Sequence, residues 1–199
     1  MYEHISYLPE NYEKTEKEYP LLIFLHDEAQ QGYEFEKIKN IGIPKLLESK
    51  KLHLDMITVC PQAPKGETWK TGKLMNLLAK INVLYRINTD KIYFVGIGIG
   101  GYGALKFATI YKDIPTAVIS VAGGGNENMA FYLKNIPIWI FHGIEDEQIP
   151  FYKAKALVDA LQNNEHLNFT AIENAGHEII DTVFDNQQIF NWILEQREK

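Results

Sequence analysis

Three segments of the chain carry residue types that could act together in hydrolysis. Residues 96–100 read GIGIG and join an apolar run to a helical stretch, and Asp146 and then His177 follow them in the sequence. A carboxylate that holds one ring nitrogen of a histidine leaves the other nitrogen free to accept a proton from a nucleophile. The order of glycine turn, acid and histidine therefore indicates a catalytic triad built on a strand-to-helix turn.

The elements that must position these segments are short apolar runs, which are typical of strands buried on both faces. The runs lie at residues 21–25, 55–60, 91–95, 117–121, 138–141 and 168–172. Helical stretches lie between them, at residues 43–49, 73–85, 101–111, 152–162 and 185–196. This alternation predicts an α/β fold with a mostly parallel central sheet, helices on both faces and no cap domain. Function is expected at the carboxyl ends of the strands, which the three segments follow.

Length and composition narrow the class of protein. A chain of 199 residues suits one domain, which we expect to span residues 1–199. The formal net charge of −6 argues against nucleic acid as a partner, and no apolar stretch is long enough to span a membrane. The single cysteine, Cys60, cannot form an internal disulfide. That favours a reducing compartment, so a cytoplasmic location is expected, while the oligomeric state stays open.

Further motifs accompany the glycine turn. They are LPENY at residues 8–12, YPLLIFLH at residues 19–26, CPQ at residues 60–62 and HG at residues 142–143. With them, residues 5–196 resemble the dienelactone hydrolase, carboxylesterase and predicted peptidase branch of the α/β-hydrolases, which are serine esterases. The resemblance implies the α/β-hydrolase fold, with an antiparallel start to the sheet. It also implies a small-molecule ester or acyl ligand, with no cofactor and no metal.

The resemblance also assigns roles to residues. Asp146 is the triad acid and His177 the base, and the backbone N–H groups of Glu28 and Ile99 would bind the oxyanion. The nucleophile belongs at position 98, the apex of the turn, where a positive φ is expected. Two simpler interpretations stand beside these roles: Asp146 could only cap the helix that follows it, and His177 could be an ordinary loop histidine.

The chain departs from this branch at two places that matter for catalysis. The nucleophile position holds Gly98, which has no side chain and cannot form an acyl-enzyme. The branch carries His-Gly-x-Gly after its first core strand, whereas this loop starts HDEA at His26, so Asp27 and Ala29 replace both glycines. If the carboxylate of Asp27 or Glu28 points inward, its charge opposes an oxyanion at short range.

No neighbouring residue is expected to replace the serine. Ile97 and Ile99 are inert, Cys60 follows a different strand, and Ser120 lies within a strand. Neither the thiol nor the hydroxyl should therefore reach the apex of the turn. His26, at a strand end, is expected to shape its own loop.

Several functional hypotheses remain open. The first is a pseudo-hydrolase that keeps the fold and the pocket. The second is an ester hydrolase in which His177, with Asp146 behind it, activates a water. The third is a carboxylesterase carrying a laboratory Ser-to-Gly substitution, although two changes in one site favour a natural replacement. A dinucleotide site formed by Gly96, Gly98 and Gly101 is a weaker alternative, because that GxGxxG lies on an internal strand.

The binding pocket is expected to be shallow and open. Loops at residues 64–75 and 123–133 should build it. Four apolar side chains of these loops could line it, namely Trp69, Met75, Met129 and Phe131.

Overall fold

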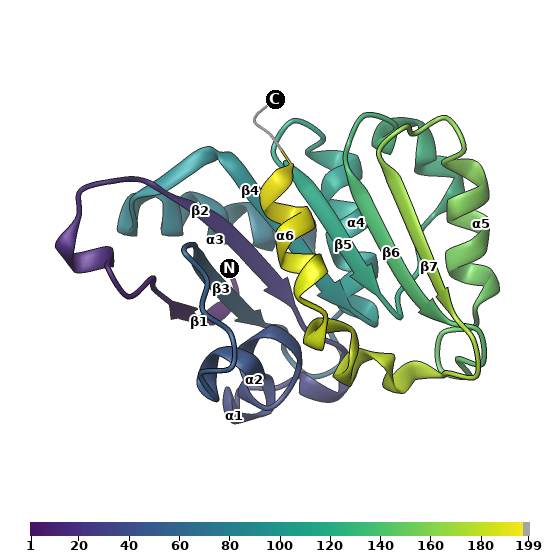
Figure 1. Cartoon of the computed structure of the whole chain (residues 1–199), viewed down its shortest axis with the longest axis horizontal. Coiled ribbons are helices and arrows are strands. Elements are labelled where there is room, and N and C mark those ends of the chain that lie inside the picture. The colour runs from purple at the N-terminus through teal and green to yellow at the C-terminus, as the bar shows by residue number, and fades with distance from the viewer. Residues whose placement is uncertain (197–199) are drawn as a thin grey trace.

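A seven-stranded sheet runs through the middle of the protein in a computed structural model that describes residues 1–196 (Figure 1). The strand order is β1-β3-β2-β4-β5-β6-β7. The strands are β1 (Glu3–Tyr7), β2 (Tyr19–Leu25), β3 (Ile57–Gln62), β4 (Ile87–Ile97), β5 (Ala117–Val121), β6 (Ile138–Gly143) and β7 (Leu167–Ile172). Strands β2 to β7 are parallel, and β1 pairs with β3 in the antiparallel direction. The predicted mostly parallel sheet with an antiparallel start is confirmed.

Strand pairing explains why β3 and β4 extend beyond their expected apolar runs. The second apolar run is expected to end at Cys60, before Pro61, but β3 continues to Gln62 because β1 pairs with it from Thr58 to Gln62. Its pairing with β2 ends at Val59, so the N–H that proline lacks is not needed on that side. Strand β4 starts at Ile87, before the apolar run, because Ile87 pairs with Tyr19 across a register shift in the ladder.

Helices connect the strands. They are α1 (Glu36–Lys39), α2 (Gly42–Glu48), α3 (Thr71–Leu84), α4 (Ile99–Ile110), α5 (Tyr152–Ala160) and α6 (Gln187–Glu195). Short 3-10 turns lie at Tyr12–Lys14, Glu28–Gln30, Glu127–Leu133, His177–Asp181 and Val183–Asp185. The sequence predicts α2 to α6 to within two residues at each end, and it misses the single-turn α1. Within residues 1–196, none of these helices is both long and apolar enough to cross a membrane.

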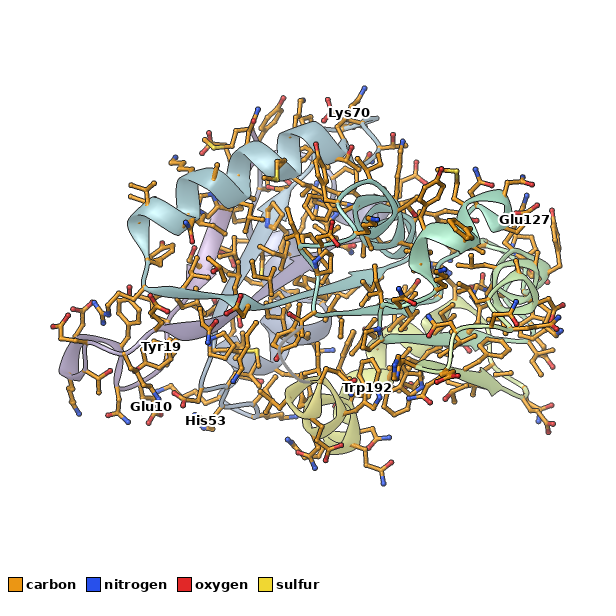
Figure 2. All side chains as sticks on the ribbon, turned by 90° about the horizontal axis from the view of Figure 1, so that it is seen from above. Glu10, Tyr19, His53, Lys70, Glu127 and Trp192 are labelled. Atoms are coloured by element: carbon orange, nitrogen blue, oxygen red, sulfur yellow. The ribbon has the colours of Figure 1, made fainter. Side chains whose placement is uncertain are left out.

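The helices bury both faces of the sheet, as expected for strands that are apolar on both sides. Helices α3, α4 and α5 pack on one face and share one core cluster with it. Helices α1, α2 and α6 cover the other face and form a second cluster. Figure 2 shows the two layers: Lys70, just before α3, and Trp192, in α6, lie on opposite sides of the sheet.

The carboxyl ends of the parallel strands lie along one edge of the sheet (Figure 1). Asp27 comes two residues after β2, Gly98 directly after β4, Asp146 three residues after β6 and His177 five residues after β7. The chain between β7 and α6 crosses this edge, so the fold brings together segments far apart in the sequence.

Candidate active site

The turn between β4 and α4 has the geometry expected of a strand-to-helix elbow. Strand β4 ends at Ile97, α4 begins at Ile99, and Gly98 between them has φ 52° and ψ −120°. This region favours glycine, because a side chain there crowds the backbone. The predicted positive φ at the apex is confirmed.

The flanking glycines let the elbow approach its surroundings closely. A Cβ atom on Gly96 would lie under 3.0 Å from the carbonyl oxygen of Gly100, across the turn itself. A Cβ atom on Gly100 would come equally close to the carbonyl oxygen of Leu25, the last residue of β2. The glycines therefore place the elbow directly against the loop that follows β2.

The side chain of Asp27, in that loop, fills the space next to Gly98. A Cβ atom built on Gly98 would clash with the carboxylate, with Oδ2 2.8 Å away and Oδ1 and Cγ closer still. The inward orientation that the sequence left undecided for Asp27 is the one observed. The space that a side chain at position 98 would enter is therefore already occupied by a carboxylate.

The Asp27 carboxylate takes the backbone donors that were expected to bind an oxyanion. Its Oδ1 accepts the N–H of Ile99 at 2.8 Å, at the first residue of α4. Burial raises the pKa of Asp27, but hydrogen bonds from His177 and from the backbone N–H groups of Ile99 and Glu28 together hold it below its ordinary value. Asp27 is therefore ionised at neutral pH. It also occupies the helix N-terminus where a dinucleotide phosphate would sit.

His177 and Asp146 are in direct contact, as the order of the segments predicts. Nδ1 of His177 lies 2.8 Å from Oδ2 of Asp146. The other carboxylate oxygen of Asp146 accepts the N–H groups of Gln148 and Ile149, each at 2.9 Å. Asp146 therefore both orders the turn after β6 and holds the histidine. It does not cap α5, whose N-cap residue is Phe151 without a side-chain hydrogen bond.

Backbone contacts hold the histidine loop against the end of β6. A Cβ atom on Gly143 would collide with the carbonyl oxygens of Ala175 and Gly176, which only a glycine avoids. The N–H of Glu145 donates to Ala175 O at 2.9 Å, and Glu178 Oε1 accepts the N–H of Gly176 at 2.8 Å. These contacts fix the position of His177 relative to Asp146.

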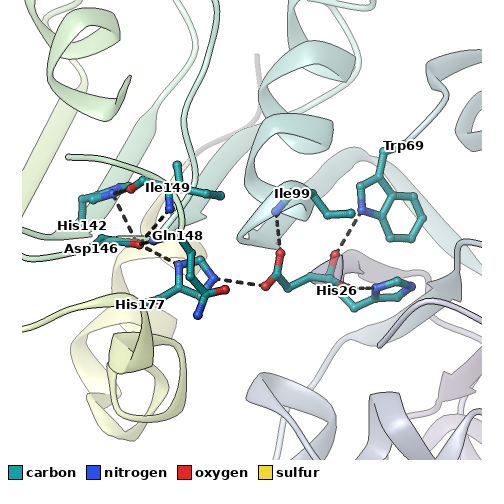
Figure 3. Close-up of polar contacts among 9 residues, drawn as sticks. His26, Trp69, Ile99, His142, Asp146, Gln148, Ile149 and His177 are labelled. Atoms are coloured by element: carbon teal, nitrogen blue, oxygen red, sulfur yellow. Dashed lines mark hydrogen bonds and ion pairs between the residues drawn. The ribbon is translucent and has the colours of Figure 1, made fainter. Parts of the chain in front are cut away.

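His177 lies between two carboxylates (Figure 3). Its Nε2 points to Oδ2 of Asp27 at 3.1 Å, and its Nδ1 points to Asp146. Burial lowers the pKa of His177, but the hydrogen bonds and charges of Asp27 and Asp146 raise it to about 9. Both ring nitrogens therefore carry protons at neutral pH and donate to a carboxylate. In this state His177 cannot accept a proton.

We expect this charge state to be visible in the titration of His177. The imidazole should titrate near pH 9 in the parent and at lower pH in Asp27→Asn, because one of its two carboxylate partners becomes an amide. Imidazole NMR shifts between pH 5 and about pH 10 measure both midpoints. Asp90→Asn, a surface substitution outside the site, is the control. A parent midpoint at the ordinary value of 6.5 would contradict the ion-pair assignment.

The raised pKa of His177 also predicts how the free energy of unfolding depends on pH. Since the folded-state pKa of His177 is raised, its contribution is complete below pH 6.5, the ordinary value, and is lost as pH rises through about 9. Urea unfolding across this window should give a steeper loss of stability for the parent than for Asp27→Asn.

The His26 ring holds the backbone of Asp27 through a hydrogen bond to its carbonyl oxygen. The N–H of Ala63 donates to His26 Nε2 at 3.0 Å, so the ring carries its proton on Nδ1 and donates to Asp27 O at 2.6 Å. Trp69 Nε1 donates to His26 O at 3.1 Å, as Figure 3 shows. Burial lowers the pKa of His26 to about 4, so the ring is neutral. The expected structural role of His26 is confirmed.

The two other candidate nucleophiles do not reach the apex. Ser120, in β5, and Cys60, in β3, are both fully buried. The Ser120 hydroxyl lies beneath the elbow against Gly101 and Gly123, and it has no hydrogen-bond partner among the described residues. Burial raises the pKa of the Cys60 thiol well above its ordinary value, so the thiol stays protonated.

A cavity of about 590 Å³ opens onto Asp27 and His177. Five carboxylate residues line it, and its lining contains no lysine or arginine within the described part of the chain. The five are Asp27, Glu145, Glu147, Glu178 and Asp181. Among residues 1–196, no group of three or more histidine, cysteine, aspartate or glutamate side chains could hold a metal ion.

The expectation that loops 64–75 and 123–133 build this cavity is wrong. The segments after β2, β6 and β7 line it instead. Trp69 is held behind the β2 loop by its bond to His26 O, and it borders a different surface cavity together with Met75. Met129 lines a third cavity beside α4, and Phe131 is 70% exposed.

Comparison with known proteins gives a likeness of fold. No family model matches the sequence, and no curated protein matches it. A thermostable esterase aligns with a TM-score of 0.86 and 22% identity over 97% of this chain, which spans 58% of that protein's length. Esterase PE8 aligns at 0.76 with 16% identity, covering 98% of this chain and 99% of its own. An S-formylglutathione hydrolase from Agrobacterium tumefaciens aligns with a TM-score of 0.71 and 13% identity, covering 97% of this chain and 89% of that protein.

Proposed function

Because the chain has the α/β-hydrolase fold, we propose that it descends from serine esterases and is a pseudo-hydrolase without serine-type acyl transfer. The observation that carries the proposal is the Asp27 carboxylate in the space beside Gly98. An acyl-enzyme needs a nucleophilic oxygen on the residue at the elbow apex, and glycine supplies none. Asp146 and His177 keep the relative arrangement of a triad acid and base.

The oxyanion site supports the same conclusion. Ile99 donates its backbone N–H to Asp27, and the N–H of Glu28 also stabilises this carboxylate. One oxyanion donor contributes about 2.7–4 kcal/mol to catalysis. A fixed negative charge about 4 Å from a developing oxyanion costs about 4 kcal/mol at an effective dielectric constant near 20. The carboxylate therefore offsets what the donors would contribute.

The cavity supports a ligand-binding role for the remaining fold. Its volume of about 590 Å³ suits a small molecule. Because five carboxylates line it, a neutral ester or acyl compound fits better than a free carboxylic acid, which would be ionised. We take this as the ligand class of the pseudo-hydrolase.

The alternative in which His177 activates a water for ester hydrolysis has less support. A general base must be unprotonated, whereas Asp27 and Asp146 raise the pKa of His177 to about 9. Its Nε2 is also engaged with Asp27 at 3.1 Å, where the attacking water would need to be. Residual ester hydrolysis by this route should increase as pH rises through about 9.

The direct test is a search for serine-hydrolase behaviour. We expect no burst with p-nitrophenyl acetate and no labelling by a fluorophosphonate probe, because both need a covalent nucleophile at the apex. Stopped-flow absorbance and intact-mass analysis measure these two results. Labelling that maps to the elbow or to the β2 loop would refute the pseudo-hydrolase proposal.

A further inference from the structure

The cavity beside α4 has a volume of about 360 Å³ and lies between α4, α5 and the 3-10 turn at Glu127–Leu133. This volume suits a small molecule, and none of the described residues that line the cavity also lines the active-site cavity. Its α4 wall consists of five residues at positions that share one face of a helix and span about 12 Å along it. They are Tyr102, Leu105, Lys106, Thr109 and Ile110. The cavity therefore follows the side of α4 and is separate from the active site.

The interior of the cavity beside α4 is apolar. Leu105, Leu133 and Leu157 line it, and each is at most 2% exposed. Met129 lines it as well, with a flexible thioether chain that adapts to the shape of a ligand. An engineered apolar cavity of about 150 Å³ holds benzene. The cavity of about 360 Å³ therefore has room for a longer hydrocarbon, which binds because it leaves water.

A run of three glycines, at residues 123–125, follows β5 and approaches the residues that line this cavity. A Cβ atom on Gly124 would lie under 3.0 Å from the hydroxyl oxygen of Tyr102. A Cβ atom on Gly125 would come equally close to Cδ2 of Leu157. A side chain at either position would therefore displace a residue of the cavity wall. The glycine run, which the proposed function does not use, keeps this wall in place.

The polar groups of the cavity can donate hydrogen bonds. Lys106 is exposed, is the only charged residue among the described residues of the lining, and has no ion-pair partner in residues 1–196. Burial raises the pKa of the Tyr102 hydroxyl, which stays protonated at neutral pH and lies one helical turn from Lys106. Asn126 accepts the N–H of Asn128 through Oδ1 at 3.1 Å, which leaves its amide nitrogen as a third donor. An anionic acceptor group complements these donors.

We propose that the cavity beside α4 binds a small carboxylic acid with an unbranched apolar chain, such as a medium-chain fatty acid. Its carboxylate contacts Lys106 and the Tyr102 hydroxyl, and its chain packs against Leu133 and Leu157. The five carboxylates of the active-site cavity repel the same ion, so the two cavities select different ligands. The inference goes beyond the proposed function, because it uses no residue of the active site.

The experiment uses octanoate, its neutral analogue octanol, and the full chain with 13C-methyl methionine. Calorimetry should show one octanoate per chain with a Kd below about 1 mM, and the Met129 methyl signal, identified through Met129→Leu, should shift on binding. Met129→Trp fills the cavity and should abolish binding of both compounds. Met75→Trp is the matched control at a different cavity and should bind both as the parent does. Urea unfolding checks that both tryptophan variants are folded.

A charge substitution tests the recognition of the carboxylate. Lys106→Gln should weaken octanoate binding about fivefold, because it removes the cation and keeps most of the side chain. It should leave octanol binding within about twofold of the parent. Lys80→Gln, which changes an exposed lysine of α3, should leave both affinities unchanged. If Met129→Trp does not fold, this pair of affinities decides the inference.

Several results would overturn the inference. They are the absence of saturable octanoate binding, binding that a folded Met129→Trp leaves intact, and equal weakening of octanoate and octanol by Lys106→Gln. A dimer in sedimentation that octanoate does not dissociate and Met129→Trp abolishes would identify a second copy of this chain as the occupant. These failures differ from failure of the proposed function, which a fluorophosphonate adduct or an ester burst would reveal.

Discussion

Gly98→Ser alone is expected to leave ester turnover within about tenfold of the parent, whereas adding Asp27→Gly should raise it by at least about 10²-fold. The serine Cβ would clash with the Asp27 carboxylate, and the residue would keep a φ of 52°. Removing the carboxylate frees this space, returns the Ile99 N–H to the oxyanion and leaves His177 with Asp146 only. The effects should be non-additive, because these groups act on one transition state.

The measurement is kcat/KM with p-nitrophenyl acetate for the parent, both single variants and the double variant. The matched control is Gly98→Ala combined with Asp27→Gly, which adds a Cβ without a nucleophile and should stay inactive. Overpacking should also cost Gly98→Ser about 1–3 kcal/mol of unfolding free energy. Strong activity from Gly98→Ser alone would show that Asp27 does not block the apex.

His177→Gln should destabilise the protein by about 3 kcal/mol near neutral pH. The substitution removes the cation that lies between two buried carboxylates, Asp27 and Asp146. Loss of one partner from a buried ion pair typically costs about 3–5 kcal/mol. We expect the lower end because backbone N–H groups still donate to both carboxylates.

Urea unfolding should reveal this cost and its electrostatic origin. Asp27→Asn combined with His177→Gln should recover more than half of the loss, because one of the two carboxylate charges is gone. His166→Gln, which changes an exposed histidine, should stay within about 0.5 kcal/mol of the parent. Equal unfolding free energies for His177→Gln and the parent would mean that the ion pairs of His177 with Asp27 and Asp146 contribute no net stability.

The pattern of apolar runs predicts most of the sheet and its helices, because buried strands need apolar residues on both faces. The run at residues 117–121 coincides with β5. Deviations arise where long-range pairing extends a strand, as at Ile87, which pairs with Tyr19 ahead of the apolar part of β4. A single turn such as α1 contains too few residues to show a helical period.

The candidate site was predictable in part. Chain order placed Asp146 next to His177, and the glycine spacing placed Gly98 at the apex with positive φ. The orientation of Asp27 could not be derived, since it depends on a backbone donor at Ile99 and on the ring of His177. The cavity was assigned to the wrong loops, because sequence does not reveal that Trp69 is held behind the β2 loop.

The separation of the contacting residues has a consequence for how the site forms during synthesis. Asp27 meets Ile99 from 72 positions away and His177 from 150 positions away. At about 5–20 residues per second, a ribosome takes roughly 8–30 s to add the 150 residues between Asp27 and His177. Throughout that interval the nascent chain carries the Asp27 charge without its cation. The ion pair is therefore among the last contacts that a newly made chain can form.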